Sequence, residues 1–403
     1  MSHLNYLEKL LEGVGTEWQA LGDLVTLRRG RVMSKGFLSE NTGIFPVYSS
    51  QTANDGMIGS IDTYDFDGEY ISWTTDGANA GTIFYRKGKF SITNVCGLMK
   101  IIDENLLNYK YLYYWLTTEA KKYVYSGMGN PKLMSHQVEK IAVPIPCPDN
   151  PEKSLAIQVE IVRILDAFTA MTAELTAELN MRKKQYNYYR DQLLSFEEGD
   201  VEWKALGEIG HIVTGRTPKS SDKSAWGNDV DFVTPSDIKN GMRNIAFPSR
   251  RLSAEGAASM SKVLLPSGSL LVTCIGADMG KTVINANDCI PNQQINAITL
   301  TDDSVQVGYL FHVLTAMREA LRRQGELGGG TMPLINKSDF SKIVVPIPSH
   351  EEQARIVAIL DKFDTLTNSI SEGLPREIEL RQKQSEYYRD LLLSFPKQEE
   401  EAA

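Results

Sequence analysis

Residues 181–196 read MRKKQYNYYRDQLLSF, and residues 380–395 read LRQKQSEYYRDLLLSF, 199 positions further along the chain. The duplication extends well beyond this phrase. KIAVPIP at 140–146 returns as KIVVPIP at 342–348, IVRILDAF at 161–168 as IVAILDKF at 356–363, and TEWQALGD at 16–23 as VEWKALGE at 201–208. An internal repeat of this kind governs the fold. The chain begins with the end of a helix and then contains a block, a helix, a second block and a second helix. Its two copies therefore form a cyclic repeat.

The repeated phrases belong to long helices. From Ile161, steps of four and three residues keep landing on mostly apolar or aromatic side chains as far as Phe196, and no proline or glycine interrupts residues 155–198. Such a heptad stripe is typical of a coiled coil. The second copy has a similar stripe, broken by four extra residues around Gly373–Pro375. Because proline is tolerated best in the first turn of a helix, this break predicts two helices placed end to end.

Neither stripe can be buried by its own helix. We therefore expect the two copies to pack as an antiparallel coiled coil, about 54 Å long for about 36 residues. The alternative is that each stripe packs only on its neighbouring block. We assign the basic cluster Arg182–Lys184 to charge pairing between the helices with nearby acids such as Glu174 and Glu178. The side chains expected to pair the helices are Leu165, Phe168, Leu175, Leu179, Tyr189, Leu193, Leu360, Phe363, Ile370, Tyr388 and Leu392.

The two blocks between the helices have a mixed α/β pattern. Strand-like runs such as residues 69–73 and 269–273 alternate with Gly, Asn and Asp turns, and helical runs occupy 107–125 and 305–323. We predict an α+β protein in which two mixed α/β domains are separated and joined by two long helices, with an internal pseudo-two-fold repeat. The predicted segments are an N-terminal helix completing the repeat (1–16), a first domain (17–147), a central helix (148–200), a second domain (201–348), a distal helix (349–396) and a frayed tail (397–403).

The composition is that of an ordinary soluble protein, with 42% hydrophobic and 23% charged residues. No run of eighteen apolar residues and no signal peptide is present, so we expect a cytoplasmic protein without a membrane span. The four cysteines lack CxxC pairing, which is typical of reduced thiols, and the five histidines show no zinc-site spacing. The net charge is −9, but residues 17–144 and 202–346 are close to neutral, so the surplus acid lies outside the two blocks.

Taken together, these features resemble the specificity subunit of a type I restriction–modification enzyme. The resemblance rests on the cyclic repeat, the PIP strand before each helix, the YYRD helix ends, the WxxLG start of each block, and TGRTPK at 214–219 followed by DFVTPSDI at 231–238. It implies two target recognition domains, each reading half of a bipartite sequence in double-stranded DNA. It also implies that the paired helices dock two modification (methyltransferase) subunits, to which restriction subunits add, with S-adenosylmethionine, ATP and Mg²⁺ bound by those partners and no cofactor in this chain.

A long helix between two readers acts as a ruler. About 54 Å corresponds to roughly 16 base pairs at 3.4 Å per step. A four-residue insertion lengthens a helix by ~6 Å and rotates it by ~40°. The spacing between half-sites should therefore follow helix length and not the reading surfaces.

The sequence lacks the patterns that catalysis of these reactions would require. Adenine methylation would need a [DN]PP[FYW] string, and the nearest, beginning at Asn130, lacks the second proline and the aromatic residue. The stretch GADMGKT at 276–282 is one residue short of a phosphate-binding loop, which needs GxxxxGK[ST], so we predict a β-turn with an exposed Lys281. We expect a non-catalytic subunit with no metal site.

DNA contacts are expected in the Gly-rich loops of both blocks, where arginine and amide side chains read base edges and Lys, Arg, Ser and Thr hold phosphates. For any single residue the alternative is a solvated loop side chain, and Gln293–Gln294 are expected to be partly structural. The candidates in the first block are Arg28, Arg29, Arg31, Lys35, Ser50, Gln51, Thr74, Thr75, Asn79, Asn130 and Lys132. Those in the second are Arg216, Thr217, Lys219, Ser236, Asp237, Lys239, Arg243, Lys281, Asn292, Gln293 and Gln294.

A second interpretation is a structural coiled-coil scaffold that binds only proteins through both blocks. The two interpretations differ in one measurable property, because phosphate contacts give DNA affinity a steep dependence on salt. An autonomous hydrolase is disfavoured because no catalytic residue pattern stands above chance.

Overall fold

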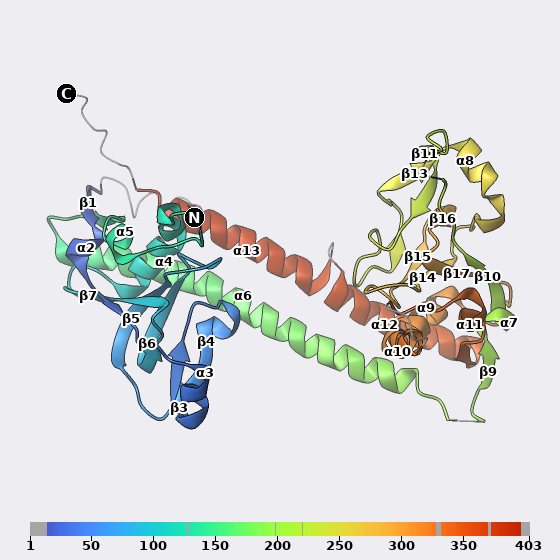
Figure 1. Ribbon diagram of the computed structural model, residues 1–403, viewed down its shortest axis with the longest axis horizontal. Helices are drawn as coiled ribbons and strands as arrows, with labels where there is room; N and C mark the ends of the chain where they lie inside the picture. The colour runs from blue at the N-terminus through green and yellow to red at the C-terminus, as the bar shows by residue number, and fades with distance from the viewer. Residues whose placement is uncertain are drawn as a thin grey trace. The chain divides into compact units, whose positions relative to one another are not determined.

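The computed structural model describes residues 14–126, 129–197, 199–219, 221–327, 332–369 and 372–395 (Figure 1). It divides into two compact units. Unit 1 comprises the chain up to Met171 together with the chain from Arg381 onward, and unit 2 comprises Thr172–Leu380. Each unit thus contains one block together with part of the central and of the distal helical segments, as the cyclic repeat predicts.

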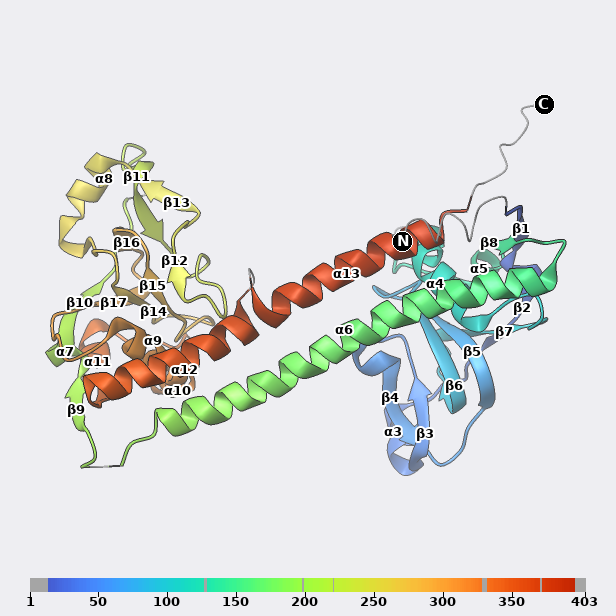
Figure 2. The same cartoon turned by 180° about the vertical axis from the view of Figure 1, so that it is seen from behind.

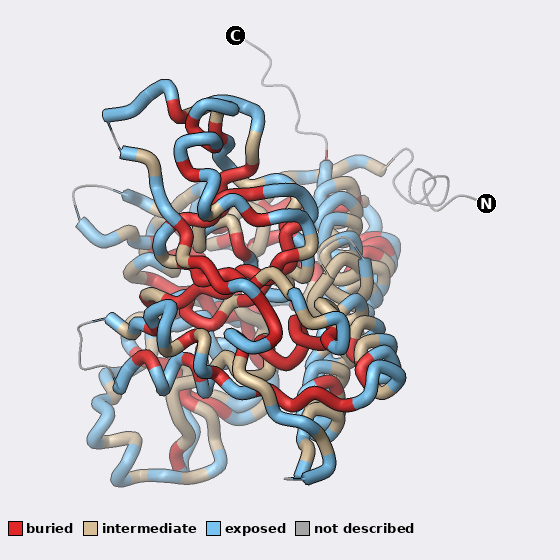
Figure 3. Tube along the Cα trace, turned by 90° about the vertical axis from the view of Figure 1, so that its right-hand side faces the viewer, coloured by how far each residue is buried: buried red, intermediate tan, exposed pale blue. Residues whose placement is uncertain are grey.

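Unit 1 is built on a six-stranded sheet with the order β2-β7-β5-β6-β3-β4. Neighbouring strands are antiparallel except β3 and β6, which are parallel. Buried residues, red in Figure 3, lie inside the folded domains, and the Trp73 side chain at 0% exposure donates from Nε1 to the Leu133 carbonyl over 2.9 Å. The strands are β2 (Val25–Arg29), β3 (Thr42–Tyr48), β4 (Met57–Ile61), β5 (Phe66–Thr74), β6 (Ile83–Ile92) and β7 (Cys96–Ile101).

Short helices and one two-stranded ribbon complete the first block. The Asn108 side chain accepts from the backbone N–H groups of Lys110 and Tyr111 and so caps α4, whose aromatic face packs on the sheet. The elements are β1 (Thr16–Ala20), α2 (Leu21–Leu24), α3 (Lys35–Glu40), η1 (Ala53–Gly56), α4 (Tyr109–Glu119), η2 (Ala120–Tyr123), α5 (Ser135–Val138) and β8 (Ala142–Pro146).

Unit 2 contains a five-stranded sheet with the order β10-β17-β14-β15-β12 and a three-stranded sheet with the order β13-β11-β16. The strands are β9 (Glu202–Ala205), β10 (Gly210–Thr214), β11 (Trp226–Val233), β12 (Asn244–Ile245), β13 (Arg250–Leu252), β14 (Leu270–Thr273), β15 (Thr282–Asn285), β16 (Cys289–Pro291), β17 (Ile295–Leu300) and β18 (Val344–Ile347). The helices are α7 (Leu206–Ile209), α8 (Ala254–Ser259), η3 (Ser261–Val263), α9 (Val307–Ala316), α10 (Arg318–Glu326) and α11 (Lys337–Ser341).

Four strands of the six-stranded sheet, β2-β7-β5-β6, correspond to β10-β17-β14-β15 of the five-stranded sheet, although their sequences diverge. Thr74 pairs with Cys96 in unit 1, and Thr273 pairs with Ile295, each 199 positions later, in unit 2. The parallel pairing of β3 with the end of β6 returns as the parallel pairing of β11 with β16. The internal repeat therefore extends through the interior of both blocks, where the amino-acid sequence alone does not reveal it.

The duplicated phrases that flank the blocks form matching ribbons. In unit 1, β1 pairs with β8 so that Trp18 lies opposite Pro144, and in unit 2, β9 pairs with β18 so that Trp203 lies opposite Pro346. A buried tyrosine hydroxyl ties each ribbon to a helix of its block, α4 or α9: Tyr111 donates to the Pro144 carbonyl over 2.8 Å and Tyr309 to the Pro346 carbonyl over 2.9 Å. The repeated WxxLG and PIP segments thus pair with each other in both units.

The long helices are α6 (Pro151–Leu193), α12 (His350–Asn368) and α13 (Gly373–Leu392), seen from the front in Figure 1 and from behind in Figure 2. The predicted break in the second copy is confirmed. It falls at Gly373, whose φ is +74° and whose position has no room for a side chain, since a Cβ there would lie 2.4 Å from the Thr365 carbonyl oxygen. The predicted N-terminal helix does not reach residue 16, because Thr16 begins β1, and residues 1–13 and the tail 397–403 lie outside the described residues.

The helices run antiparallel, and their apolar stripes serve two purposes. In unit 1, Phe168 of α6 stacks on Tyr388 of α13 with ring centroids 5.2 Å apart, while Leu165 and Leu392 enter the core of the first block. In unit 2, Tyr189 of α6 stacks on Phe363 of α12 over 5.7 Å.

Both packing alternatives therefore occur, because the stripe residues contact the facing helix and also the neighbouring block. Leu360 lies in the core of unit 2, Leu193 packs on that core, and Leu175 and Leu179 are half-buried. Ile370 lies outside the described residues. The predicted pairing of Arg182 between helices is wrong, since its Nε lies 2.7 Å from Glu178 Oε1, one turn earlier on the same helix.

A repeated aspartate joins each helix to its block. In unit 1, Asp166 accepts from the Tyr114 hydroxyl over 2.8 Å and pairs with Lys110. In unit 2, Asp361 of the same IVxILD phrase bonds the buried His312 over 2.6 Å and pairs with Arg243. Burial alone would raise the pKa of Asp361, but the hydrogen bond from His312 and the charge of Arg243 outweigh it and hold that pKa below its usual value.

Candidate nucleic-acid interface

In unit 1, hydrogen bonds bring together loops that lie far apart in the sequence. The Asn94 N–H donates to the Arg31 carbonyl over 3.1 Å, and the Gly77 N–H donates to the Pro131 carbonyl over 3.0 Å. The Asn79 amide donates to the Ser50 carbonyl over 3.3 Å. The predicted stretches 28–31, 50–51, 74–79 and 130–132 therefore form one cluster at the surface of the first block.

The basic side chains of this cluster are exposed but differ in their partners. Arg28 has no side-chain hydrogen bond or ion pair to a described residue, whereas Arg29 reaches the Asn94 carbonyl at 3.5 Å. Arg31 is 3.0 Å from Asp65, and Lys132 is 3.8 Å from Asp76. Arginine and lysine held at an exposed loop in this way are suited to contact phosphate oxygens or base edges.

The remaining first-block candidates lie less directly in the cluster. Lys35 is exposed in the first turn of α3, and no bond that joins it to the cluster is found among the described residues. The Gln51 amide donates to the Met57 carbonyl and so supports its own loop. Asn130 is exposed beside Lys132. These positions remain expectations from the sequence.

Two first-block candidates are corrected by the structure. Thr74 and Thr75 have 0% exposure, because β5 continues through Thr74 and the next residue packs beneath the loop. The Thr75 hydroxyl donates to Asp76 over 2.6 Å. These threonine side chains therefore support the loop from inside and do not face a groove of DNA.

Unit 2 assembles the equivalent loops in the same way. The Arg216 N–H donates to the Pro291 carbonyl over 2.9 Å, and the Thr217 hydroxyl donates to Gln293 Oε1. The Cys274 N–H donates to the Gln294 carbonyl over 2.8 Å. Arg216 and Lys219 are exposed and have no side-chain partner within the described part of the chain. Ser236 and Lys239 are also exposed, and the Lys239 amine donates to the Ser236 carbonyl over 2.6 Å.

Several second-block candidates are structural. Arg243 forms an ion pair with Asp361 of α12 and stacks over the Phe311 ring. Lys281 is 12% exposed, 2.8 Å from Asp278 and 3.2 Å from the Ile238 carbonyl, so the prediction of an exposed lysine is wrong although the β-turn is present. Its hydrogen bond lowers the pKa of Asp278. The Arg243 and Lys281 side chains therefore make contacts within the fold.

Asp237, Asn292 and Gln294 are also occupied within the fold. Asp237 accepts from the Thr234 and Ser249 N–H groups, and although burial alone would raise its pKa, these bonds hold it below the usual value. Asn292 is 8% exposed and bonds Gln294 through both its amide and its carbonyl oxygen. Neither glutamine begins a strand, since β17 starts at Ile295, but the Gln294 side chain accepts from the Asn292 amide within the fold, whereas Gln293 is exposed.

Sequence reasoning missed Asn94. It is exposed between β6 and β7, at the position equivalent to Gln293, 199 residues earlier. A single asparagine flanked by Thr93 and Val95 carries no local signal. Only the pairing of the strands shows that it and Gln293 stand at the same place.

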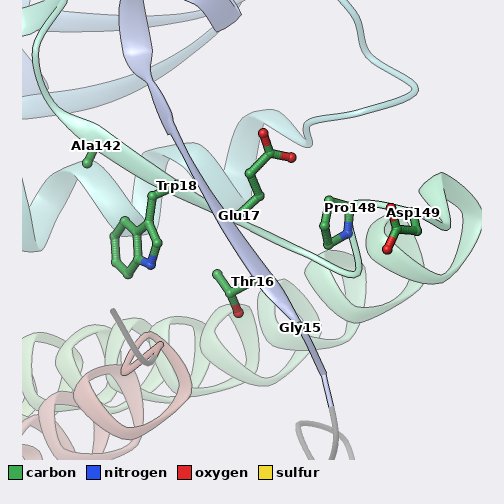
Figure 4. Close-up of a pocket in the computed structure, with 7 residues that line it drawn as sticks. All are labelled: Gly15, Thr16, Glu17, Trp18, Ala142, Pro148 and Asp149. Atoms are coloured by element: carbon green, nitrogen blue, oxygen red, sulfur yellow. The ribbon is translucent and has the colours of Figure 1, made fainter. Parts of the chain in front are cut away.

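A cavity of about 620 Å³ in unit 1 lies outside this cluster (Figure 4). It borders the β1–β8 ribbon and contains Glu17 and Asp149 but no basic residue. A phosphate backbone would be repelled there. In the part of the chain that the structure describes, no helix is long and apolar enough to cross a membrane, and no three His, Cys, Asp or Glu side chains are grouped as metal ligands would be.

Comparisons with known proteins agree with this architecture. The model of the type I restriction modification DNA specificity domain matches residues 15–182 and again 198–380. The specificity subunit of the Escherichia coli type I restriction enzyme EcoR124I/EcoR124II is 42% identical over 414 residues, covering 99% of each chain. A putative type I restriction enzyme specificity subunit of Haemophilus influenzae, S.HindORF215P, is 33% identical and covers 97% of this chain and 98% of its own.

Solved structures share the fold at low sequence identity. The crystal structure of the type I restriction–modification S subunit from M. genitalium matches with a TM-score of 0.62 and 14% identity, covering 96% of this chain and 98% of that one. The family match spans both blocks and most of both helices, and the E. coli relative aligns over nearly its whole length. The chain therefore belongs to the family of type I restriction–modification DNA specificity subunits.

Proposed function

We propose that each block is a target recognition domain whose loop cluster reads one half of a bipartite sequence in double-stranded DNA. One observation carries the proposal: two sheets whose first four strands correspond, β2-β7-β5-β6 and β10-β17-β14-β15, hold exposed arginine and amide side chains at equivalent places, while the elements around them differ. In unit 1 these groups include Arg31 and Asn94, and in unit 2 Arg216 and Gln293. A shared scaffold with unlike surroundings suits two readers of unlike half-sites.

The chemistry of these side chains fits base recognition. Arginine pairs with guanine O6 and N7, an amide pairs with adenine N6 and N7, and hydroxyl and backbone N–H groups bind phosphate. The proposal assigns methylation and cleavage to partner subunits, which would bind S-adenosylmethionine, ATP and Mg²⁺. The chain would then work beside DNA in the cytoplasm and contribute no catalytic group.

We propose further that helix length sets the half-site spacing. Helix α6 is 43 residues long, longer than the sequence pattern alone indicates. At 1.5 Å per residue a helix of this length measures about 65 Å, or roughly 19 base pairs of DNA.

Exchanging one block tests the assignment. Replacing residues 202–346 by the equivalent block of another family member is expected to change one half of the recognised sequence and to leave the other half and the spacer unchanged. Sequencing of methylated sites in cells with the exchanged chain measures this. A change in both halves or in neither would contradict one reader per block. Absence of any salt-dependent DNA binding by the assembled complex would instead favour the protein-only scaffold.

The paired helices are proposed to dock two copies of the methyltransferase subunit. In unit 2, a groove of about 900 Å³ between α6 and α12 is lined by side chains that include Gln185, Tyr189, Leu193, Ser195 and Phe363. The same five residue types recur in unit 1 through the repeat, at Gln384, Tyr388, Leu392, Ser394 and Phe168. A surface that occurs in both copies of an internal repeat suits the binding of two copies of one partner.

Two exposed tyrosines provide the test of this docking. Tyr188 is 59% exposed and Tyr387, its repeat counterpart, 57% exposed, and exposed aromatic side chains are common anchors of protein interfaces. Tyr188→Ala and Tyr387→Ala are each expected to lose one methyltransferase subunit, and the double variant both, with affinity falling roughly 30-fold per site. Native mass spectrometry measures the stoichiometry. Tyr64→Ala, also exposed but within the first block, is the control, and retention of both subunits by the double variant would contradict the proposal.

A further inference from the structure

Each recognition domain presents one side chain on an identically built β-turn. In unit 1 the turn runs from Thr93 to Cys96, closed by the Cys96 N–H donating to the Thr93 carbonyl over 3.0 Å. In unit 2 it runs from Asn292 to Ile295, closed by the corresponding bond of 3.1 Å. The first residue of each turn is buried, with 4% exposure for Thr93 and 8% for Asn292. Asn94 and Gln293 therefore occupy the same second position of the two turns.

The bonds that hold the unit 1 turn recur in the unit 2 turn. Its first N–H donates to the preceding parallel strand: Thr93 to Tyr48 over 2.9 Å, and Asn292 to Val233 over 2.8 Å. Its third carbonyl accepts from the loop that follows β5 or β14. Val95 accepts from Thr75 over 3.0 Å, and Gln294 accepts from Cys274 over 2.8 Å. The backbone of both turns is thus fixed from two sides.

The backbone of a glycine lies against the start of each turn. A Cβ at Gly30 would lie 2.1 Å from the Ile92 carbonyl oxygen, and one at Gly215 would lie 2.2 Å from the Asn292 carbonyl oxygen. The residue that follows is arginine in both cases, Arg31 and Arg216. These Gly-Arg steps place a guanidinium-bearing residue next to the second position of each turn.

The presented amides retain hydrogen-bonding capacity. Both Asn94 and Gln293 are exposed. No hydrogen bond from the Asn94 side chain to any described residue is found, and Gln293 uses only its oxygen, which accepts from Thr217. Because neither amide N–H₂ group donates to a described residue, each amide offers a group that a base edge can satisfy.

We propose that Asn94 and Gln293 are the matched base-reading amides of the two recognition domains, each directed at an adenine edge in the major groove. This inference rests on the proposed function and names the residues that carry it. An amide that donates to N7 and accepts from N6 distinguishes adenine from the other bases, and the adjacent Arg31 or Arg216 binds phosphate or a neighbouring guanine.

The experiment uses the complex with its methyltransferase subunits and the target found by sequencing its methylated sites. Each adenine of a target duplex is replaced singly by 7-deazaadenine, which lacks the N7 acceptor. One replacement in each half-site is expected to weaken binding by the wild-type complex roughly 5- to 30-fold. The Asn94→Ala complex is expected to bind the unmodified target as weakly as the wild-type complex binds the 7-deazaadenine target. The replacement in the half-site read by the first domain should not weaken its binding further. Gln293→Ala is expected to behave likewise at the other half-site.

The controls separate this inference from the function on which it rests. Asn105→Ala removes another exposed amide of the first domain and should bind like the wild type. Asn94→Gln keeps the amide and should retain part of the sensitivity to 7-deazaadenine. If the wild-type complex has a target but both alanine variants discriminate adenine as it does, the inference is overturned and the proposed function stands. If the wild-type complex shows no sequence preference, the proposed function fails as well.

Discussion

Gly30→Ala is expected to remove sequence reading by the first recognition domain while leaving the second intact, and Gly215→Ala to do the reverse. A Cβ at Gly30 would lie 2.1 Å from the Ile92 carbonyl oxygen and 2.4 Å from that of Thr93. At Gly215 the Pro291 and Asn292 carbonyl oxygens would both lie 2.2 Å away. These are backbone atoms of the buried start of each turn, so they cannot swing aside as a flexible side chain would. The turn must move, and the amide that it presents moves with it.

The expected cost is about 3 kcal/mol of the free energy of unfolding, typical of inserting a methyl group where no space exists. Denaturant unfolding measures the cost, and sequencing of methylated sites measures the effect on each half of the target. Gly36→Ala is the matched control, because the nearest atom to a Cβ there is Ser34 Oγ at 3.7 Å. If Gly30→Ala is as stable as Gly36→Ala and methylates the same sequence, the close packing of the Gly-Arg step on the turn is wrong.

The sequence predicts the long helices and marks the segments that form the ribbons, because the repeated residues pair with one another or join a helix to its domain. Trp18 and Trp203 lie opposite the prolines of the repeated PIP strands, and Asp166 and Asp361 of the repeated ILD phrase join helix to domain. Each of these contacts needs a particular side chain in both copies, so duplication leaves the residues recognisable. The helix break at Gly373 is predictable for the same reason, as an interruption of an otherwise repeated stripe.

The equivalence of the two sheets is hidden from the sequence. Backbone pairing accepts many different side chains, so Trp73 opposite Gly97 in one sheet corresponds to Val272 opposite Asn296 in the other. The separation of equivalent residues also shifts, from 185 positions at Gly30 and Gly215 to 199 at Thr74 and Thr273. Without the strand register, Asn94 cannot be matched to Gln293.

The charge and hydrogen-bonding type of a side chain do not by themselves distinguish a residue that contacts DNA from one that stabilises the fold. Arg243 and Lys281 satisfy the composition rule for DNA contact, yet each is tied to an aspartate within the fold. Thr75 lies only a few residues before Asn79 but faces inward. Whether a polar residue near the end of a strand is buried depends on where that strand ends, which the sequence locates only to within a few residues.

A buried arginine holds the loop that carries Ser50 and Gln51. Arg86 is 2% exposed and lies with its guanidinium carbon 3.6 Å from the centre of the Tyr48 ring. Its Nη1 is 2.7 Å from Asp55 Oδ2, and its Nη2 donates to the Asp55 carbonyl over 2.8 Å. Burial lowers the pKa of Arg86, and the Asp55 charge opposes that change. Asp55 itself has a φ of +52°, so the ion pair also holds a strained turn.

Asp55→Ala is accordingly expected to lower the free energy of unfolding by about 2 kcal/mol, because it leaves a buried guanidinium without a carboxylate and places alanine at positive φ. Asp55→Asn, whose amide oxygen still accepts and which tolerates this φ, should lose less. Combining Asp55→Ala with Arg86→Met should recover part of the loss, since the unpaired charge is then gone. Denaturant unfolding of the wild type, Asp55→Ala, Asp55→Asn and the double variant measures these differences. Asp67→Ala is the control for loss of an exposed carboxylate. Equal unfolding midpoints for Asp55→Ala and Asp67→Ala would show that the ion pair does not stabilise this loop.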